Sequence, residues 1–295
     1  MTGKIGFARL LGERRVLVAD GATGTTYQGL GLPLGTAPEE WLFQAPERVV
    51  GVHRAFVEAG ADLILTNTFG ATPLRLQHTS LPGRVRDVNV RAVSLAREAA
   101  RNGTLVAGSM GPTGHLFEPL GPLTRDECVD NYVQQAGALT EGGADLLVLE
   151  TFFSLDEALA AIEGTYGVSD LPVVVSFSFD QGTRTMMGHS PVQVVEAVAA
   201  LGVAAVGSNC GRSLADADVV VGELIGAAGE LPVWAKPNAG VPRVVGDAVV
   251  YEADPETLAR HARSYAEQGA RIVGGCCGSG PEHVGAIARA IADFR

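Results

Sequence analysis

Two adjacent cysteines, Cys276 and Cys277, stand in a glycine-rich break after an apolar run at 271–273. Neighbouring cysteines seldom form a disulfide with each other, because the geometry of that bond does not suit adjacent residues, but both can bind one soft metal ion. A third cysteine, Cys210, follows the apolar run 203–206 in a similar glycine-rich setting. Three thiolates that leave one position open favour a catalytic zinc site over a closed structural one.

Free cysteines also occur as ordinary core residues, since cysteine is among the most buried residue types. A single cysteine would favour that interpretation. Here three of the four cysteines follow apolar runs and lie among glycines, which favours metal binding for Cys210, Cys276 and Cys277. The fourth, Cys128, lies in a helical pattern without metal-binding neighbours, and we expect it to pack in the core.

Three thiolates leave Zn²⁺ with a net charge of about −1, which makes it a poor Lewis acid for water activation. Such a centre still binds an incoming thiol as the thiolate, although a free thiol has a pKa of about 8.5. A metal-bound thiolate is suited to attack on a methyl group, whereas water-activating zinc sites use histidine and carboxylate ligands. The three cysteines therefore predict a thiol S-methyltransferase, in which they are both metal ligands and catalytic residues.

A thiol substrate that is also an amino acid needs partners for its ammonium and carboxylate groups. Asp20 and Glu150 can bind the ammonium, and the turn Gly21-Ala22-Thr23-Gly24 can bind the carboxylate through backbone N–H groups, as a small anion-binding nest. Asp20 could instead be a turn or cap residue. Glu150 ends the apolar run 146–149, so it would be partly buried and would need a partner.

The elements that must position these residues are eight short apolar runs separated by helical patterns. Continuous apolar runs of this length are typical of buried parallel strands. Eight strand–helix units in 295 residues fit an α/β fold of the (β/α)8 TIM-barrel type better than an open sheet. The expected strands lie at 15–19, 61–67, 104–108, 146–149, 172–179, 203–206, 232–236 and 271–273. The expected helices lie at about 46–60, 83–101, 124–142, 154–166, 190–201, 213–228, 254–268 and 281–294. No linker or shift in composition divides the chain, so we expect one barrel domain over residues 1–295.

Active sites of this fold lie at the carboxyl ends of the strands. Polar or metal-binding side chains follow the expected strands at that end, and we expect them to meet at one face: Asp20, Asn67, Glu150, Asn209, Cys210, Asn238, Cys276 and Cys277. We include Asn209 and Asn238 in the predicted substrate site for this reason.

Composition excludes several classes of partner. A net charge of −11 argues against binding to nucleic acid or to an anionic membrane surface. No segment approaches 18 uninterrupted apolar residues, and residues 1–15 lack an apolar stretch of signal-peptide length. Four cysteines, two of them adjacent, do not make a disulfide framework. We therefore expect a cytoplasmic protein.

The chain resembles the homocysteine S-methyltransferase family, and within it most closely the homocysteine-binding module of cobalamin-dependent methionine synthases. The resemblance extends nearly from end to end, and the cysteine pair with a distant Asn-Cys is its most specific feature. The motifs that carry it are DGATGT (20–25), AGADLILTNTFGAT (59–72), GPTG with PLG (111–121), LETF (149–152), GSNC (207–210), KPNAGVP (236–242) and GGCCG with PEHV (274–284).

This resemblance implies zinc on Cys210, Cys276 and Cys277, homocysteine as the substrate and methionine as the product. It also implies that DGATGT and Glu150 bind the amino-acid end of homocysteine. In such domains the asparagine that matches Asn238 can occupy the open position of the zinc until homocysteine displaces it.

The methyl donor is a separate question, since this module normally precedes folate- and cobalamin-binding domains and the chain ends after one barrel. The segment 111–123 resembles the cobalamin-dependent module, so we expect methylcobalamin to be supplied in trans by a corrinoid protein. Relatives that act alone use S-methylmethionine, S-adenosylmethionine or betaine, and these remain alternative donors.

Three other classes of protein stay open. A non-catalytic zinc- or corrinoid-handling module would bind the same ligands without turnover. A redox enzyme is less favoured, because the chain has no C-x-x-C motif. A phosphate-binding barrel enzyme would use the glycine loop at 274–280 and would bind no metal.

Overall fold

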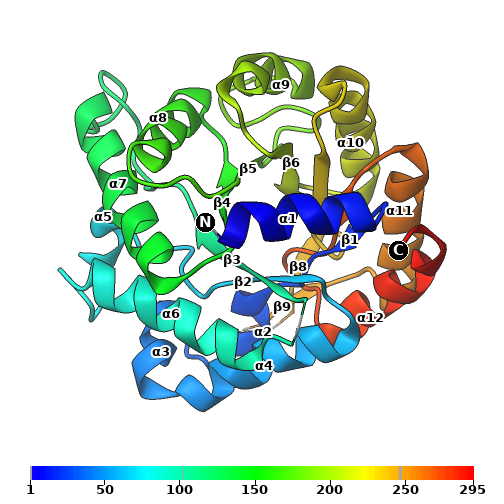
Figure 1. The fold of residues 1–295 in the computed structure, drawn as a ribbon, viewed down its shortest axis with the longest axis horizontal. Coiled ribbons are helices and arrows are strands. Elements are labelled where there is room, and N and C mark those ends of the chain that lie inside the picture. Colours follow the sequence, from blue (N-terminus) through cyan, green and yellow to red (C-terminus); the bar gives the residue numbers. More distant parts are fainter. Residues whose placement is uncertain (1, 102, 246–247) are drawn as a thin grey trace.

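The computed structural model describes residues 2–101, 103–245 and 248–295, and in this part of the chain eight parallel strands form the central sheet (Figure 1). Their order is β1-β10-β7-β6-β5-β4-β3-β2, and a bridge between Ala19 and Leu63 joins the two edges, so the sheet nearly closes into a barrel. The strands are β1 (Leu17–Val18), β2 (Leu63–Leu65), β3 (Leu105–Met110), β4 (Leu146–Phe152), β5 (Val173–Phe177), β6 (Ala205–Cys210), β7 (Val233–Pro237) and β10 (Ile272–Val273). The predicted (β/α)8 barrel is confirmed.

Helices surround this barrel and alternate with its strands. The main helices are α4 (Pro46–Ala59), α6 (Val85–Ala99), α7 (Arg125–Gly142), α8 (Leu155–Tyr166), α9 (Pro191–Val198), α10 (Leu214–Ala228), α11 (Pro255–Gln268) and α12 (Pro281–Ala290). The remaining helices lie outside this alternation: α1 (Thr2–Glu13), α2 (Thr23–Gly29), α3 (Trp41–Gln44), α5 (Pro73–Leu76), and the 3₁₀ turns η1 (Pro38–Glu40), η2 (Ala199–Leu201) and η3 (Ala292–Phe294). Two expected helices are shorter than predicted, because their last turns become η2 and η3.

Local signals in the sequence set several of these boundaries. Thr124 caps α7 in a capping box, in which its side chain accepts from the Glu127 N–H and the Glu127 carboxylate accepts from the Thr124 N–H. The helix ends at Gly143, whose φ of 87° is a left-handed conformation that glycine adopts readily. Strand β4, which carries Glu150, begins shortly after this cap, at Leu146.

The barrel has two apolar layers, set by the alternation of side chains along each strand. Leu17 and Ala19 point into the barrel, where they meet Trp234 from β7. Val16 and Val18 point outward into the larger cluster between strands and helices. Cys128 is fully buried in this outer layer and burial raises its pKa to about 12, which confirms that it packs in the core.

One end of the barrel is covered by α1, which the sequence did not predict because charges are scattered through that segment. Phe7 from α1 is buried against the interior cluster, and Arg14 pairs with Asp62 just before β2. This places α1 across the amino ends of the strands, as Figure 1 shows.

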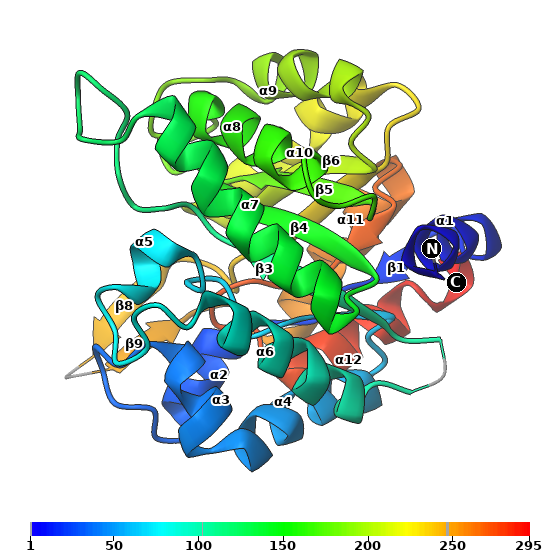
Figure 2. The same ribbon diagram turned by 60° about the vertical axis from the view of Figure 1, so that its left-hand side comes forward.

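The opposite end carries a second element that was not predicted, the antiparallel hairpin β8 (Pro242–Val245) and β9 (Ala248–Tyr251), which follows β7. In Figure 2 this hairpin and α1 lie at opposite ends of the molecule. The carboxyl ends of the strands therefore open beside the hairpin.

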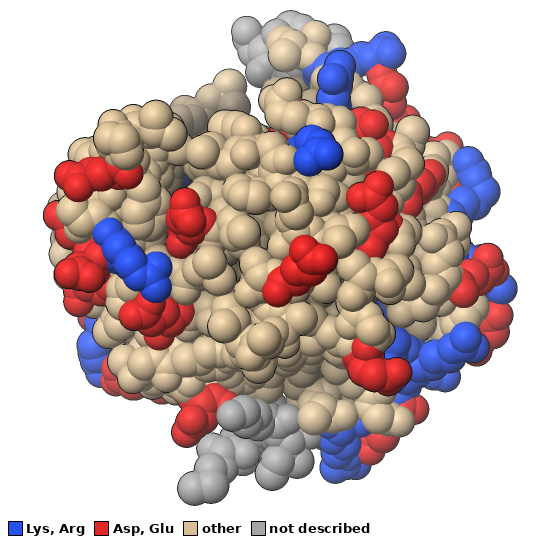
Figure 3. Space-filling model, turned by 90° about the horizontal axis from the view of Figure 1, so that it is seen from above, with Lys and Arg blue, Asp and Glu red and all other residues tan. Residues whose placement is uncertain are grey.

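The outer surface agrees with the acidic composition. On the side that carries α9, seen in Figure 3, acidic side chains are scattered and basic side chains do not gather into one continuous patch. None of the helices in the described residues combines the length and hydropathy that crossing a bilayer requires.

Candidate active site

The three predicted cysteines converge at the carboxyl ends of β6 and β10. The sulfur atoms of Cys210, Cys276 and Cys277 all lie within 4.8 Å of one another, and the Sγ atoms of Cys210 and Cys276 are 3.1 Å apart. Among the described residues this is the one group of three or more metal-binding side chains so close together. Zinc–sulfur bonds of about 2.3 Å place tetrahedral sulfur ligands about 3.8 Å apart, so the cluster fits one zinc ion after small side-chain adjustments.

The loop that carries the cysteine pair is held by backbone hydrogen bonds. The Cys276 N–H donates to Pro237 O at 2.8 Å, and the Ala239 N–H donates to Cys277 O at 2.9 Å. Gly278 has a φ of 82°, and the ring of Tyr251 from β9 occupies the space that a Cβ would need there. A side chain at residue 278 would therefore displace the hairpin or the cysteines.

The electrostatics of the cluster favour a thiolate. Hydrogen bonds from Cys210 and Cys276 lower the pKa of Cys277 to about 3, whereas its hydrogen bonds with the other two thiols raise the pKa of Cys210. These shifts favour a thiolate at Cys277 alone, since the pKa of Cys276 is also raised, to about 11, and the thiolate is the form that binds a soft metal ion.

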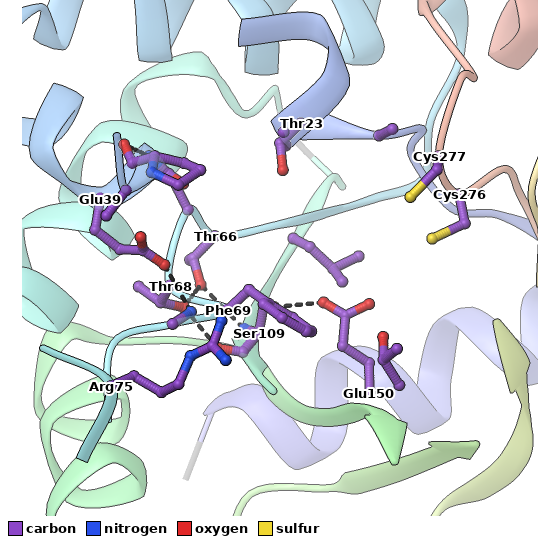
Figure 4. Close-up of a pocket in the computed structure, with 18 of the residues that line it drawn as sticks. Thr23, Glu39, Thr66, Thr68, Phe69, Arg75, Ser109, Glu150, Cys276 and Cys277 are labelled. Carbon is purple, nitrogen blue, oxygen red and sulfur yellow. Dashed lines mark hydrogen bonds between the residues drawn. The ribbon is translucent and has the colours of Figure 1, made fainter. Parts of the chain in front are cut away.

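A cavity of about 710 Å³ opens from the cysteines along the barrel mouth. Figure 4 shows Cys276, Cys277 and Glu150 at one end of it, with Glu39 and Arg75 at the other. Such a volume is within the usual range for small-molecule sites.

Glu150 is the carboxylate that faces this cavity at its cysteine end. It is 8% exposed, and the hydroxyl of Ser109 donates a short hydrogen bond to its Oε1. Burial raises the pKa of Glu150 to about 7, against the opposing effect of the Lys236 ammonium. The group therefore titrates near neutral pH.

Asp20 does not face the cavity. Its Oδ1 accepts from Lys236 Nζ at 2.6 Å and its Oδ2 accepts from the Leu65 N–H at 2.8 Å, and the side chain is fully buried. In this structure the Asp20 carboxylate is a partner of Lys236, and its direct contact with a substrate stays a prediction.

Lys236 itself lines the cavity beside the cysteines, and it was missed as a site residue although it begins the KPNAGVP motif. Burial lowers the pKa of its ammonium, but the carboxylates of Asp20 and Glu150 outweigh that effect and the net shift is upward. Burial raises the pKa of Asp20, and Lys236 opposes this shift. Lys236 Nζ lies 2.6 Å from Asp20 Oδ1 and the other carboxylate oxygen accepts from a backbone N–H, so we assign Asp20 and Lys236 as an ionised pair.

The predicted glycine turn lines the cavity, but as the start of a helix. Gly21, Ala22, Thr23, Gly24 and Thr25 all contribute to the wall, and α2 begins at Thr23. The Ala22 N–H already donates to Ser279 O at 2.9 Å. The N–H groups of Thr23, Gly24 and Thr25 have no acceptor within the described residues, so they are the available donors.

The two predicted asparagines lie behind the cavity wall and not in it. Asn238 accepts from the Cys277 N–H at 3.0 Å and donates to Gly211 O at 2.9 Å, which ties the cysteine pair to the loop after β6. Asn209 is 1% exposed and is bonded to Thr151 and Ser176. Their amide groups bond other parts of the chain here, and the predictions that these residues contact a substrate or fill the open metal position stay predictions.

The far end of the cavity was not predicted. Glu39 is buried and accepts from the Gly70 N–H at 2.6 Å. The guanidinium carbon of Arg75 lies 5.9 Å from the centre of the Phe69 ring. These side chains come from η1 and from the β2–α5 segment, and no pattern in the sequence predicts that the two segments meet.

Three clustered thiols beside a small-molecule cavity at the carboxyl face of a (β/α)8 barrel define a barrel enzyme with a candidate thiol-based active site. The family model described as homocysteine S-methyltransferase matches residues 17–291. The chain belongs to this methyltransferase family, and the predicted resemblance is confirmed.

Individual relatives agree with this assignment. The chain is 33% identical over 297 residues to the methionine synthase of Mycobacterium leprae, and the match covers 95% of this chain but 24% of that protein. The crystal structure of the homocysteine methyltransferase MmuM from Escherichia coli in its oxidized form superposes with a TM-score of 0.83 at 26% identity, over 96% of this chain and 99% of that one. Its metallated form gives a TM-score of 0.82 at the same identity and coverage.

Proposed function

We propose that this protein methylates homocysteine to methionine at a zinc centre held by Cys210, Cys276 and Cys277. One observation carries the proposal: the three thiols and the Glu150 carboxylate open into one end of the same cavity. Family membership and the metallated form of the Escherichia coli relative support the substrate and the metal. We also propose that residues 1–295 act as one barrel domain.

The residues of the chain have separate tasks in this proposal. Zinc, when bound, lowers the pKa of a substrate thiol so that it is available as a nucleophile at neutral pH. Glu150 binds the ammonium group of homocysteine, and the free N–H groups of Thr23, Gly24 and Thr25 bind its carboxylate. Lys236 balances part of the negative charge around the thiols, since its ammonium is buried beside them.

For the donor we propose methylcobalamin delivered in trans by a corrinoid protein. The loops around the cavity mouth support this choice, because they carry exposed apolar side chains suited to a protein partner. These residues are Leu116 and Leu120 before α7, Met186 and Met187 before α9, and Val241 and Val244 at the hairpin. Thr113, Gly114 and His115, which directly precede Leu116 in the same loop, line the cavity.

A small onium donor is the second candidate, and the far end of the cavity favours it. The buried carboxylate of Glu39 can attract a cation, which would compete there with the Arg75 guanidinium that lies 5.9 Å from the centre of the Phe69 ring. A sulfonium or quaternary ammonium compound placed there would share the cavity with homocysteine.

A donor panel tests the proposed function. Zinc-loaded protein is incubated with homocysteine and with methylcobalamin bound to a corrinoid protein, S-methylmethionine, S-adenosylmethionine or betaine, and methionine is quantified by mass spectrometry. We expect methionine from the corrinoid donor, at a rate that falls with ionic strength. Turnover with an onium compound alone would replace the donor assignment, and no methionine from any donor would contradict the function.

Glu150 gives homocysteine binding a pH dependence. Because the pKa of Glu150 is raised to about 7, the carboxylate is largely neutral below that pH and ionised above it. Affinity for the homocysteine ammonium is therefore expected to increase as the pH rises through 7. Glu150→Gln should weaken binding by about 1.5–3 kcal/mol, the range for a hydrogen bond to a charged group.

Calorimetric titration of both proteins between pH 6 and 8 measures this effect. Ionisation of the substrate thiol contributes equally to both, so the difference between their slopes isolates Glu150. Equal slopes and equal affinities would show that Glu150 does not contact homocysteine.

A further inference from the structure

Backbone strain is concentrated beside the cysteine cluster. In the described residues, the non-glycine positions with a positive φ are Thr151, at 65°, and Cys210, at 59°. A left-handed backbone is uncommon for residues other than glycine, and for a β-branched residue it persists only when the surroundings hold it. Thr151 also lies where the β4–β5 ladder shifts register, between Leu149 and Phe152.

The side chain of Asn209 supplies the bonds that the ladder lacks at this bulge. Its Oδ1 accepts from the Thr151 N–H at 2.9 Å and from the Ser176 hydroxyl at 2.7 Å, and its Nδ2 donates to Thr151 Oγ1 at 2.6 Å. Asn209 thus links β6 to β4 across the end of β5.

The bulge determines how Glu150 is presented. In a regular strand successive side chains point to opposite faces, but Glu150 and Thr151 both line the cavity. The extra residue in β4 turns both side chains toward the mouth. Because Asn209 holds Thr151, it also fixes the backbone that carries Glu150.

The same amide group faces the cysteines. Asn209 precedes Cys210, and its Nδ2 lies 3.5 Å from Cys210 Sγ and 3.8 Å from Cys276 Sγ. An N–H group directed at sulfur stabilises negative charge there and orients the ligand, as outer-shell partners of metal ligands commonly do.

We propose that Asn209 is a positioning residue that holds Glu150 and the cysteine cluster in register with each other. This inference rests on the proposed function. If homocysteine binds through its ammonium to Glu150 and through its thiol at the cysteine cluster, the distance between these two groups must be fixed. Asn209 acts through Thr151 and Cys210 and not by contact, since it does not line the cavity.

The test compares Asn209→Ala with wild type in two readouts that need no methyl transfer. Homocysteine binding to the zinc-loaded protein is expected to weaken, by a factor of the same order as the roughly 10- to 100-fold loss of metal affinity or activity that follows removal of an outer-shell partner. In cobalt-loaded protein, the thiolate-to-cobalt charge-transfer band is expected to shift. Ser169→Ala is the control, because Ser169 is buried and accepts from the Thr140 hydroxyl and the Leu171 N–H near the amino end of β5, away from the cysteines; it should change neither readout.

A second pair of variants tests the backbone argument and does not depend on Asn209→Ala folding well. Ser176→Ala removes one bond to Asn209 Oδ1 and should weaken homocysteine binding severalfold. Glycine adopts a positive φ without strain, so Thr151→Gly combined with Asn209→Ala should bind homocysteine more tightly than Asn209→Ala alone.

The inference is overturned if Asn209→Ala keeps wild-type homocysteine affinity and an unchanged cobalt spectrum, or if Ser169→Ala changes both equally. Independent, additive effects of Thr151→Gly and Asn209→Ala would overturn the backbone argument. Failure of the proposed function looks different, since wild-type protein would then not bind homocysteine at all.

Discussion

Replacing Cys276 by alanine is expected to remove zinc from the protein and to abolish methionine formation. The three sulfur atoms lie within 4.8 Å of one another, and two thiolates with no third ligand make a weak zinc site. Because loss of an outer-shell partner alone lowers affinity by about 10- to 100-fold, loss of a ligand should exceed that range. Metal content after dialysis, measured by mass spectrometry, and turnover with the donor panel check the expectation.

Cys128→Ala is the control for this result. Cys128 is fully buried in the outer core layer, so its replacement should lower stability slightly and leave zinc content unchanged. Stoichiometric zinc in the Cys276→Ala/Cys277→Ala double variant would contradict the assignment of the site.

The second large effect concerns stability. Lys236→Met leaves the Asp20 carboxylate buried without its cation, although the two groups are 2.6 Å apart and almost inaccessible to solvent in the native protein. Breaking one side of a buried ion pair lowers the free energy of unfolding by about 3–5 kcal/mol. We expect a loss of this size by denaturant unfolding at pH 7.

The pH dependence of that variant has a defined sign. An unpaired buried Asp20 has a folded-state pKa well above its unfolded value, so stability is present at low pH and is lost as the pH rises through the folded pKa. Adding Asp20→Asn should recover part of the loss, because no charge then remains buried. A Lys236→Met protein as stable as wild type at pH 7, with no pH trend, would show that the pair is not ionised.

The eight strands and the convergence of the cysteines could be predicted from sequence for the same reason. Buried parallel strands have sequences that are short apolar runs, and in a barrel the carboxyl ends of all the strands lie at one face. Residues directly after those runs, such as Cys210 and Cys276, are therefore brought together wherever they stand in the chain. Glu150 directly follows the apolar run 146–149 and lines the cavity for the same reason.

The partners of these residues could not be predicted, because they depend on contacts between distant segments. Lys236 meets Asp20 across 216 positions of sequence, which follows only from closure of the barrel between β7, β10 and β1. The extra residue in β4 that brings both Glu150 and Thr151 to the cavity cannot be recognised in the sequence, because the apolar run before it looks like that of a regular strand. Without that information, Asp20 and Asn209 were predicted to touch a substrate, and neither residue lines the cavity of this structure.

X-ray absorption at the zinc edge tests the central claim most directly. Zinc-loaded protein is measured alone and with selenohomocysteine, whose selenium is distinguishable from the cysteine sulfurs. We predict three sulfur neighbours at about 2.3 Å in the first sample and one additional selenium neighbour in the second. Zinc bound without three sulfur ligands, or no selenium neighbour at saturating selenohomocysteine, would contradict the account.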